Sequence, residues 1–172
     1  MEPDGLTLAA TAGRVRTMEG VLSAVASLTE VPRNSVPELA RLARTSSSSF
    51  RAYLAEHGRR PRAEYDWSGY CLLHVLTYLE DRDVDLERSE FDAESAAINE
   101  VHDLTVLITP AHKRFLDRLD PGAHRAEELA AHFEEMGLGF AESGRAGLAG
   151  LRLLRGTIAE LDDDRVLLLH IG

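Results

Sequence analysis

Residues 64–80 read Glu-Tyr-Asp-Trp-Ser-Gly-Tyr-Cys-Leu-Leu-His-Val-Leu-Thr-Tyr-Leu-Glu and hold the only tryptophan, the only cysteine and three of the four tyrosines. Drawn as a helix, with about 100° between successive residues, this stretch has large side chains on two opposite faces. The first face is mainly aliphatic and carries Tyr65, Leu72, Leu76 and Leu79. The second is aromatic with polar tips and carries Trp67, Tyr70, Cys71, His74 and Tyr78. Large side chains on both faces indicate a buried helix, so residues 64–82 are predicted to form the centre of the fold.

Segments on both sides of this helix repeat apolar residues at spacings of three and four, which is typical of helices. Further helices are predicted at 6–28, 35–58 with a break near the serine run, 89–108, 110–119, 123–136 and 148–161, with a glycine-rich loop at 138–147. The sequence therefore predicts an all-α bundle of six or seven helices. Two alternatives stay open. Residues 104–108 also fit a strand, and residues 156–171 fit a β-hairpin as well as the favoured helix with a short extended tail.

The composition bounds the class of protein. A chain of 172 residues with 44% hydrophobic and 28% charged residues is long enough for a domain with its own core. No apolar run is long enough to span a bilayer, and the acidic start of the chain lacks the basic-then-apolar order of a signal peptide. A single cysteine cannot form an internal disulfide, which fits a reducing compartment. We therefore expect a cytoplasmic protein that does not enter a membrane.

Charge is distributed unevenly along the chain. Residues 1–63 carry nine arginines and six acidic residues, a net charge of +3, whereas the whole chain carries −10 and residues 64–172 therefore carry −13. This asymmetry predicts a basic contact surface joined to an acidic body. We expect a helical part at 1–63 and an acidic helical part at 64–172 for ligand sensing or homodimer formation, either as two parts or as one continuous domain.

The most specific local pattern lies in residues 35–54. It reads Ser-Val-Pro-Glu-Leu-Ala-Arg-Leu-Ala-Arg-Thr-Ser at 35–46 and continues through Ser49-Phe50 to Tyr53-Leu54. The stretch resembles the helix-turn-helix of TetR-type transcriptional repressors, whose second helix presents its first turn to base edges while nearby arginines contact phosphates. The resemblance implies a DNA partner for residues 35–62, with candidate contacts at Ser46, Ser47, Ser49, Arg41, Arg44, Arg51, Arg59, Arg60 and Arg62.

The aromatic face of residues 64–82 is a second candidate site. Aromatic walls can bury a small molecule while tyrosine hydroxyls and a histidine orient it, so the candidate ligand-binding residues are Trp67, Tyr70, His74 and Tyr78. The alternative is a core face whose polar tips bond to the backbone. Because no cation stands next to Cys71 in the sequence, we expect a buried, inert thiol there.

Metal or acid–base chemistry has weaker support. Glu128 and His132 are four residues apart and could share a ligand or a proton, and Glu100, His102 and Asp103 cluster elsewhere, although His102 lies off the apolar line of its predicted helix. The ligand spacings of common metal sites are absent, as are phosphate loops and dinucleotide fingerprints. We therefore expect no metal and no cofactor, with these side chains on a solvated face.

Three functions remain in competition at this stage. The leading hypothesis is a small cytoplasmic regulator that binds DNA and has a helical ligand-sensing part. The second is a compact all-α small-molecule-binding protein or enzyme that uses the aromatic and histidine face of residues 64–82. The third is an acidic protein-interaction module of the inhibitor or immunity type, since residues 80–103 hold ten acidic residues and two arginines. No motif decides whether the protein is an enzyme.

Overall fold

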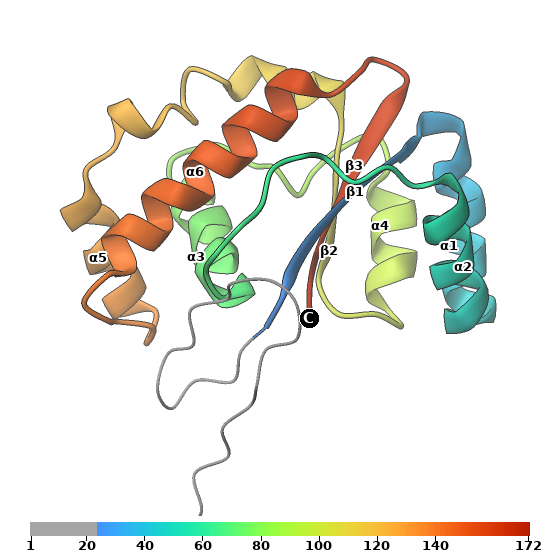
Figure 1. Ribbon diagram of the computed structural model, residues 1–172, viewed down its shortest axis with the longest axis horizontal. Helices are drawn as coiled ribbons and strands as arrows, with labels where there is room; N and C mark the ends of the chain where they lie inside the picture. Colours follow the sequence, from blue (N-terminus) through green and yellow to red (C-terminus); the bar gives the residue numbers. More distant parts are fainter. Residues whose placement is uncertain (1–23) are drawn as a thin grey trace, which may run out of the picture.

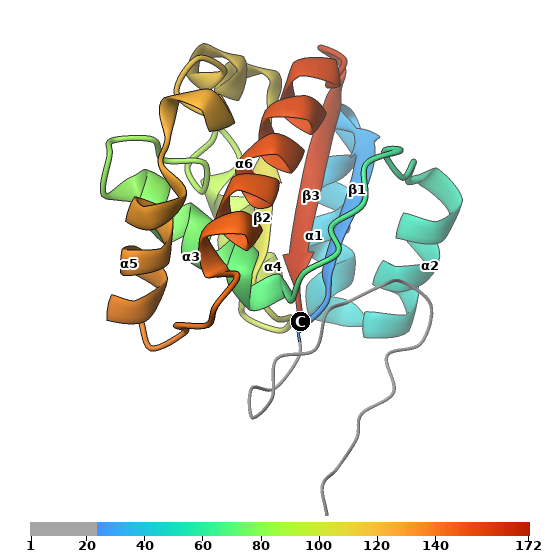
Figure 2. The same ribbon diagram turned by 60° about the vertical axis from the view of Figure 1, so that its left-hand side comes forward.

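A three-stranded antiparallel sheet stands at the centre of the computed structural model, which describes residues 24–172, and helices cover both faces of the sheet (Figure 1). The strands are β1 (Ala26–Pro32), β2 (Thr105–Ile108) and β3 (Arg165–Ile171). Their order is β1-β3-β2, so the last strand of the chain lies in the middle (Figure 2). Strand β3 is almost continuously apolar, as expected for a strand that is covered on both faces.

The prediction of an all-α bundle was wrong, because the fold is mixed α/β. Residues 26–28, expected at the end of the first helix, belong to β1; the rest of that predicted helix lies mainly outside the described residues. The expected extended tail is β3, which pairs with both other strands. Short apolar runs fit a helix and a buried strand equally well. The sequence therefore allowed an extended structure at residues 166–171 but did not indicate which strands pair with it.

Three helices cover one face of the sheet: α3 (Gly69–Glu80), α5 (Ala126–Glu135) and α6 (Ser143–Glu160), with the short 3₁₀ helices η2 (Pro110–Phe115) and η3 (Pro121–Ala123) beside them. The predicted central helix is confirmed as α3, although it begins at Gly69. Ser68 caps it, since its hydroxyl accepts a hydrogen bond from the backbone N–H of Tyr70 at 3.3 Å. We call this side of the sheet the α3 face.

The segment expected to be a loop at 138–147 is partly helical, because α6 begins at Ser143. Its glycines are contact points with the neighbouring helices. A Cβ atom at Gly144 would clash with the carbonyl oxygen of Ala126, and one at Gly147 would lie 3.0 Å from the side chain of Leu129. Small residues at this spacing let α6 approach α5 closely. Gly137, with φ of +80°, ends α5 as the sequence predicts.

The opposite face of the sheet, the α1 face, is covered by α1 (Val36–Thr45), α2 (Ser47–His57) and α4 (Asp92–Asn99), and the 3₁₀ turn η1 (Arg33–Ser35) leads into α1. A single extended residue, Ser46, separates α1 from α2. Two successive helices in residues 36–57 are therefore confirmed. Within residues 24–172, no helix combines the length and apolar character needed to cross a membrane.

Asn99, the last residue of α4, is hydrogen-bonded to Thr105, the first residue of β2. Its side-chain oxygen accepts a hydrogen bond from the backbone N–H of Thr105 at 2.7 Å, and its side-chain nitrogen donates to the carbonyl oxygen of Thr105 at 2.9 Å. The helix predicted at 89–108 is therefore shorter than expected, and the strand alternative for residues 104–108 is confirmed at 105–108. The same two bonds hold the 100–104 loop in place.

Candidate functional site

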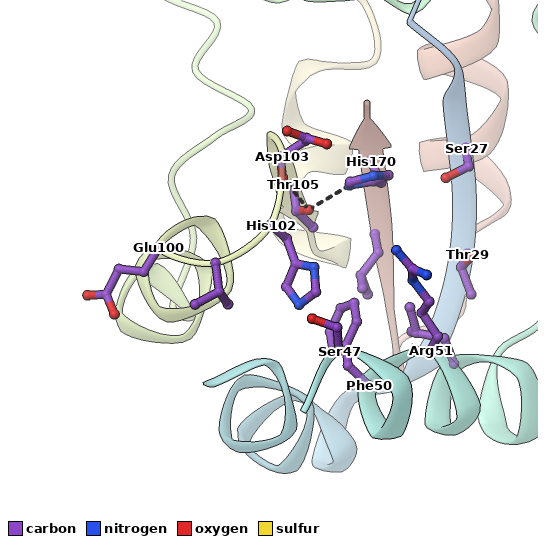
Figure 3. A pocket seen from close by; sticks show the side chains of 13 residues that line it. Ser27, Thr29, Ser47, Phe50, Arg51, Glu100, His102, Asp103, Thr105 and His170 are labelled. Atoms are coloured by element: carbon purple, nitrogen blue, oxygen red, sulfur yellow. Dashed lines mark hydrogen bonds between the residues drawn. The ribbon is translucent and has the colours of Figure 1, made fainter. Parts of the chain in front are cut away.

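A cavity of about 480 Å³ opens at one end of the α1 face, between α2, the loop after α4 and the sheet (Figure 3). We call it the His170 pocket. Helix α2 contributes one wall, the loop a second and the sheet the floor. The lining residues are Ser27, Thr29, Ser47, Phe50, Arg51, Leu54, Glu100, Val101, His102, Asp103, Thr105, Leu168 and His170.

The floor is polar because, at this end of the sheet, each of the three strands has a polar residue on the α1 face. On the α1 face, Val31 of β1 stands opposite Val166 of β3, and both are fully buried. At the other end of the same face, His170 stands opposite Ser27 on one side and Thr105 on the other. Packing against the helices stops where this polar row begins, and the pocket lies over the row.

Hydrogen bonds fix the orientation of the His170 ring. The hydroxyl of Thr105 lies 3.1 Å from the backbone carbonyl oxygen of Asp103, to which it can donate, and 3.0 Å from Nδ1 of His170. Burial, the largest cause, lowers the pKa of His170; His102 and Arg51 lower the pKa further, against the opposing charge of Asp103.

His102 and Arg51 complete the polar part of the pocket. The ring of His102 stacks on Phe50, with 4.5 Å between ring centroids, and its Nε2 atom is buried without a hydrogen-bond partner within the described chain. Arg51 is exposed on α2 and points toward His170 (Figure 3). Arg51 has no ion-pair partner among residues 24–172, although Glu100 and Asp103 line the same pocket.

The pocket combines these polar groups with an apolar wall formed by Phe50, Leu54 and Leu168. Its volume is in the range of small-molecule sites, which are about 300–1,000 Å³. Residues 24–172 contain no group of three or more histidine, cysteine, aspartate or glutamate side chains that could hold a metal ion. The arrangement suits an organic molecule with one apolar part and one charged part.

The residues predicted to bind a ligand lie elsewhere, on the α3 face: Trp67 and Tyr78 are buried in its core, and Tyr70 and His74 are half-buried. Trp67 is buried and lies 6.0 Å from Phe140 between ring centroids, and Tyr70 packs against the same cluster. None of Trp67, Tyr70, His74 and Tyr78 lines the His170 pocket. The structure does bring these residues together, but on the opposite side of the sheet from the pocket.

Tyr78 has the most polar surroundings of that group. It is fully buried, and its hydroxyl lies 3.0 Å from Nδ1 of His124. The guanidinium of Arg82 covers its ring at 3.6 Å from the ring centroid. His74 lies 5.6 Å from Phe133 between ring centroids; burial first, and then His132, lowers the pKa of His74. The nearby His132 bonds to Thr77, and Glu128 lies 3.9 Å from Arg82, so these two residues have separate partners.

Three of the arginines predicted to contact DNA bind carboxylates of the protein itself. Arg41 pairs with Glu38 at 2.6 Å, and Arg44 pairs with Glu100 at 3.2 Å. The guanidinium of Arg59 lies 2.5 Å from the buried carboxylate of Glu30 and 3.0 Å from Asp162.

The other predicted DNA contacts are divided between two places. Ser47 and Arg51 line the His170 pocket, while Ser46 caps α2 by accepting a hydrogen bond from Ser49 at 3.3 Å. Arg60 and Arg62 are exposed in the connection between α2 and α3. The arginines predicted to contact DNA therefore do not form one continuous basic surface.

The sequence did not indicate a binding site at His102, Asp103 and His170. The spacing of residues 89–108 predicts a helix in which His102 points away from the apolar line, whereas α4 ends at Asn99 and His102 belongs to a loop. His170 is the one polar residue in an apolar tail, and that was the available signal. Its neighbours come from distant strands, so the cluster depends on strand pairing.

Models of protein families, curated proteins and solved structures were compared with this chain, and none of them matches it.

Proposed function

We propose that the protein binds a small organic acid with an apolar portion in the His170 pocket. The observation that carries the proposal is the position of Arg51, which extends its guanidinium toward His170 beside a cavity with an apolar wall and has no ion-pair partner among residues 24–172. Arginine suits this task because its charge is permanent and its donors match a carboxylate or phosphate. The hydroxyls of Ser27 and Ser47 supply further donors within the same lining.

The proposal keeps small-molecule binding and moves it from the helix at 64–82 to the other face of the sheet. It is better supported than DNA binding by α2. Arg41, Arg44 and Arg59 would have to leave carboxylate partners before they could contact phosphates. Two of the other predicted DNA contacts, Ser47 and Arg51, line a cavity of the size that binds small molecules.

Calorimetric titration with 3-phenylpropanoate and with phenyl phosphate tests the proposal, since each probe joins an anion to a phenyl ring. We expect Arg51→Gln to weaken binding of the better probe by about tenfold or more, because a charge-assisted hydrogen bond contributes about 1.5–3 kcal/mol. Arg60→Gln is the matched control, since Arg60 is exposed outside the pocket.

Two outcomes would contradict the proposal. One is the absence of measurable binding by either probe at millimolar concentration. The other is an equal loss of affinity in the Arg51 and Arg60 variants, which would indicate a general effect of positive charge.

A further inference from the structure

The His170 pocket is lined by one arginine, Arg51, and by two acidic residues, Asp103 and Glu100, of which Glu100 pairs with Arg44. Arg51 and Asp103 both act electrostatically on the His170 ring, with opposite signs. They come from different elements, α2 and the loop after α4, and Figure 3 shows them around the same histidine. Neither forms an ion pair within the described part of the chain.

Asp103 and His170 are neighbours at this end of the sheet. A Cβ atom built at Gly172 would lie 2.6 Å from Oδ2 of Asp103 and 3.0 Å from Nε2 of His170, so Gly172 lies against both side chains. The exposed carboxylate of Asp103 has only acceptor atoms and a negative charge. It therefore favours a ligand group that is positively charged and donates hydrogen bonds.

An ammonium group meets both requirements, since it carries positive charge and three donor hydrogens. A carboxylate on the same ligand would face Arg51, and an apolar side chain would lie against Phe50, Leu54 and Leu168. A plain organic acid would leave the Asp103 carboxylate without a donor, and a plain amine would leave Arg51 without a partner.

From this arrangement we infer that the ligand is an α-amino acid with an apolar or aromatic side chain, bound as a zwitterion between Arg51 and Asp103. The inference rests on the proposed function and specifies its ligand class. Arg51 fixes the carboxylate, Asp103 fixes the ammonium, and the apolar wall holds the side chain. Recognition of both charges would make such an amino acid bind more tightly than a simple fatty or aromatic acid.

A series of probes that differ in one group tests the inference by calorimetry. Phenylalanine carries both charges, 3-phenylpropanoate lacks the ammonium group, and phenylalanine amide lacks the carboxylate. We expect phenylalanine to bind at least about tenfold more tightly than either of the other two, since each lost contact leaves a charged pocket group unpaired.

Asp103→Asn should remove most of the advantage of phenylalanine over 3-phenylpropanoate and leave the affinity for 3-phenylpropanoate unchanged or higher. The variant should fold normally, because the Asp103 side chain is exposed and the bond from Thr105 goes to the backbone carbonyl. Asp117→Asn, at an exposed aspartate outside the pocket, is the matched control and should change neither affinity.

The outcomes separate the two proposals. Equal binding of phenylalanine and 3-phenylpropanoate, both weakened by Arg51→Gln, would overturn the amino-acid inference and leave the organic-acid function standing. An advantage for phenylalanine that survives Asp103→Asn would also overturn the inference. If none of the three probes binds, both proposals fail.

Discussion

The two faces of the sheet carry similar apolar side chains but differ in burial at the end that contains His170. On the α3 face, Leu167, Leu169 and Ile171 of β3 are all buried under helices along the whole strand. On the α1 face, burial extends from Val166 to Leu168 and stops at His170. The α3 face is therefore covered along the whole of β3, whereas the candidate site lies where the helices of the α1 face leave the sheet open.

The largest effect that separates the two faces is expected from removing one phenylalanine ring on each. Phe133 is fully buried on the α3 face, and Phe133→Ala should lower the free energy of unfolding by about 3–5 kcal/mol. Phe50 borders the His170 pocket, so Phe50→Ala should cost about half as much, because the ring already has open space on one side. Urea denaturation measures both, and equal losses would show that the pocket wall is packed like the core.

Close packing of α6 on the α3 face gives a second contrast, within one helix. Gly144→Ala places a methyl group against the Ala126 carbonyl and should lower the free energy of unfolding by about 1–3 kcal/mol. Gly156→Ala meets nothing within 4 Å and should raise it by about 0.5–1 kcal/mol, because alanine favours helix. Thermal unfolding distinguishes the two signs; a stable Gly144 variant would mean that α5 and α6 can separate without cost.

Asn99 provides a comparable test for the α1 face. Asn99→Ala leaves the buried backbone groups of Thr105 without their side-chain partners and should lower the free energy of unfolding by about 1–3 kcal/mol. It should also weaken binding in the His170 pocket, because the loop carrying His102 and Asp103 is released. Asn99→Asp retains the acceptor but not the donor and should fall between the two. Unchanged ligand affinity in Asn99→Ala would show that the loop is held by other contacts.

The smallest effect is a shift with pH that both faces share. Burial lowers the pKa of His74 on the α3 face and of His170 on the α1 face. The unfolded chain therefore binds protons at a higher pH than the folded chain, and stability should fall as the pH drops below about 6.5 toward the folded-state pKa values. His74→Gln and His170→Gln should each flatten this dependence in urea titrations at pH 7.5 and 5.5. A dependence that is unchanged in both variants would assign it to other groups.

Element identity was predictable where a helix was long and strongly periodic. The segments around Leu72 and Leu129, and the segment that begins at Val36, are helices as the sequence indicates. The sheet could not be predicted with the same rules, because β1 and β3 are short and each side chain pattern also fits a helix. Pairing between the two ends of the described chain is a tertiary fact that spacing along the sequence does not encode.

The site was less predictable than the fold. Aromatic residues on one face of α3 indicated a ligand-binding site because they are large and lie together, but the same properties make them good core residues. The pocket residues are ordinary types in separate segments, and Ser27, Thr105 and His170 become neighbours only through strand register. Residues 1–63 do carry a net positive charge, yet Arg41, Arg44 and Arg59 form ion pairs with acidic side chains of the protein. The net charge of this part of the chain therefore did not identify a basic surface available to DNA.

The central place of β3 has a consequence for how the chain folds during synthesis. Both β1 and β2 form their ladders with β3 alone, and β3 leaves the ribosome after every other described element. The earlier segments can form helices, and Glu30 can pair with Arg59, but neither early strand has another strand to pair with until residues 165–171 emerge. Pairing across such a long separation is slow, so formation of the β1–β3 ladder is expected to limit the folding rate. A chain that stops short of residue 165 would therefore lack the whole sheet, not only one of its strands.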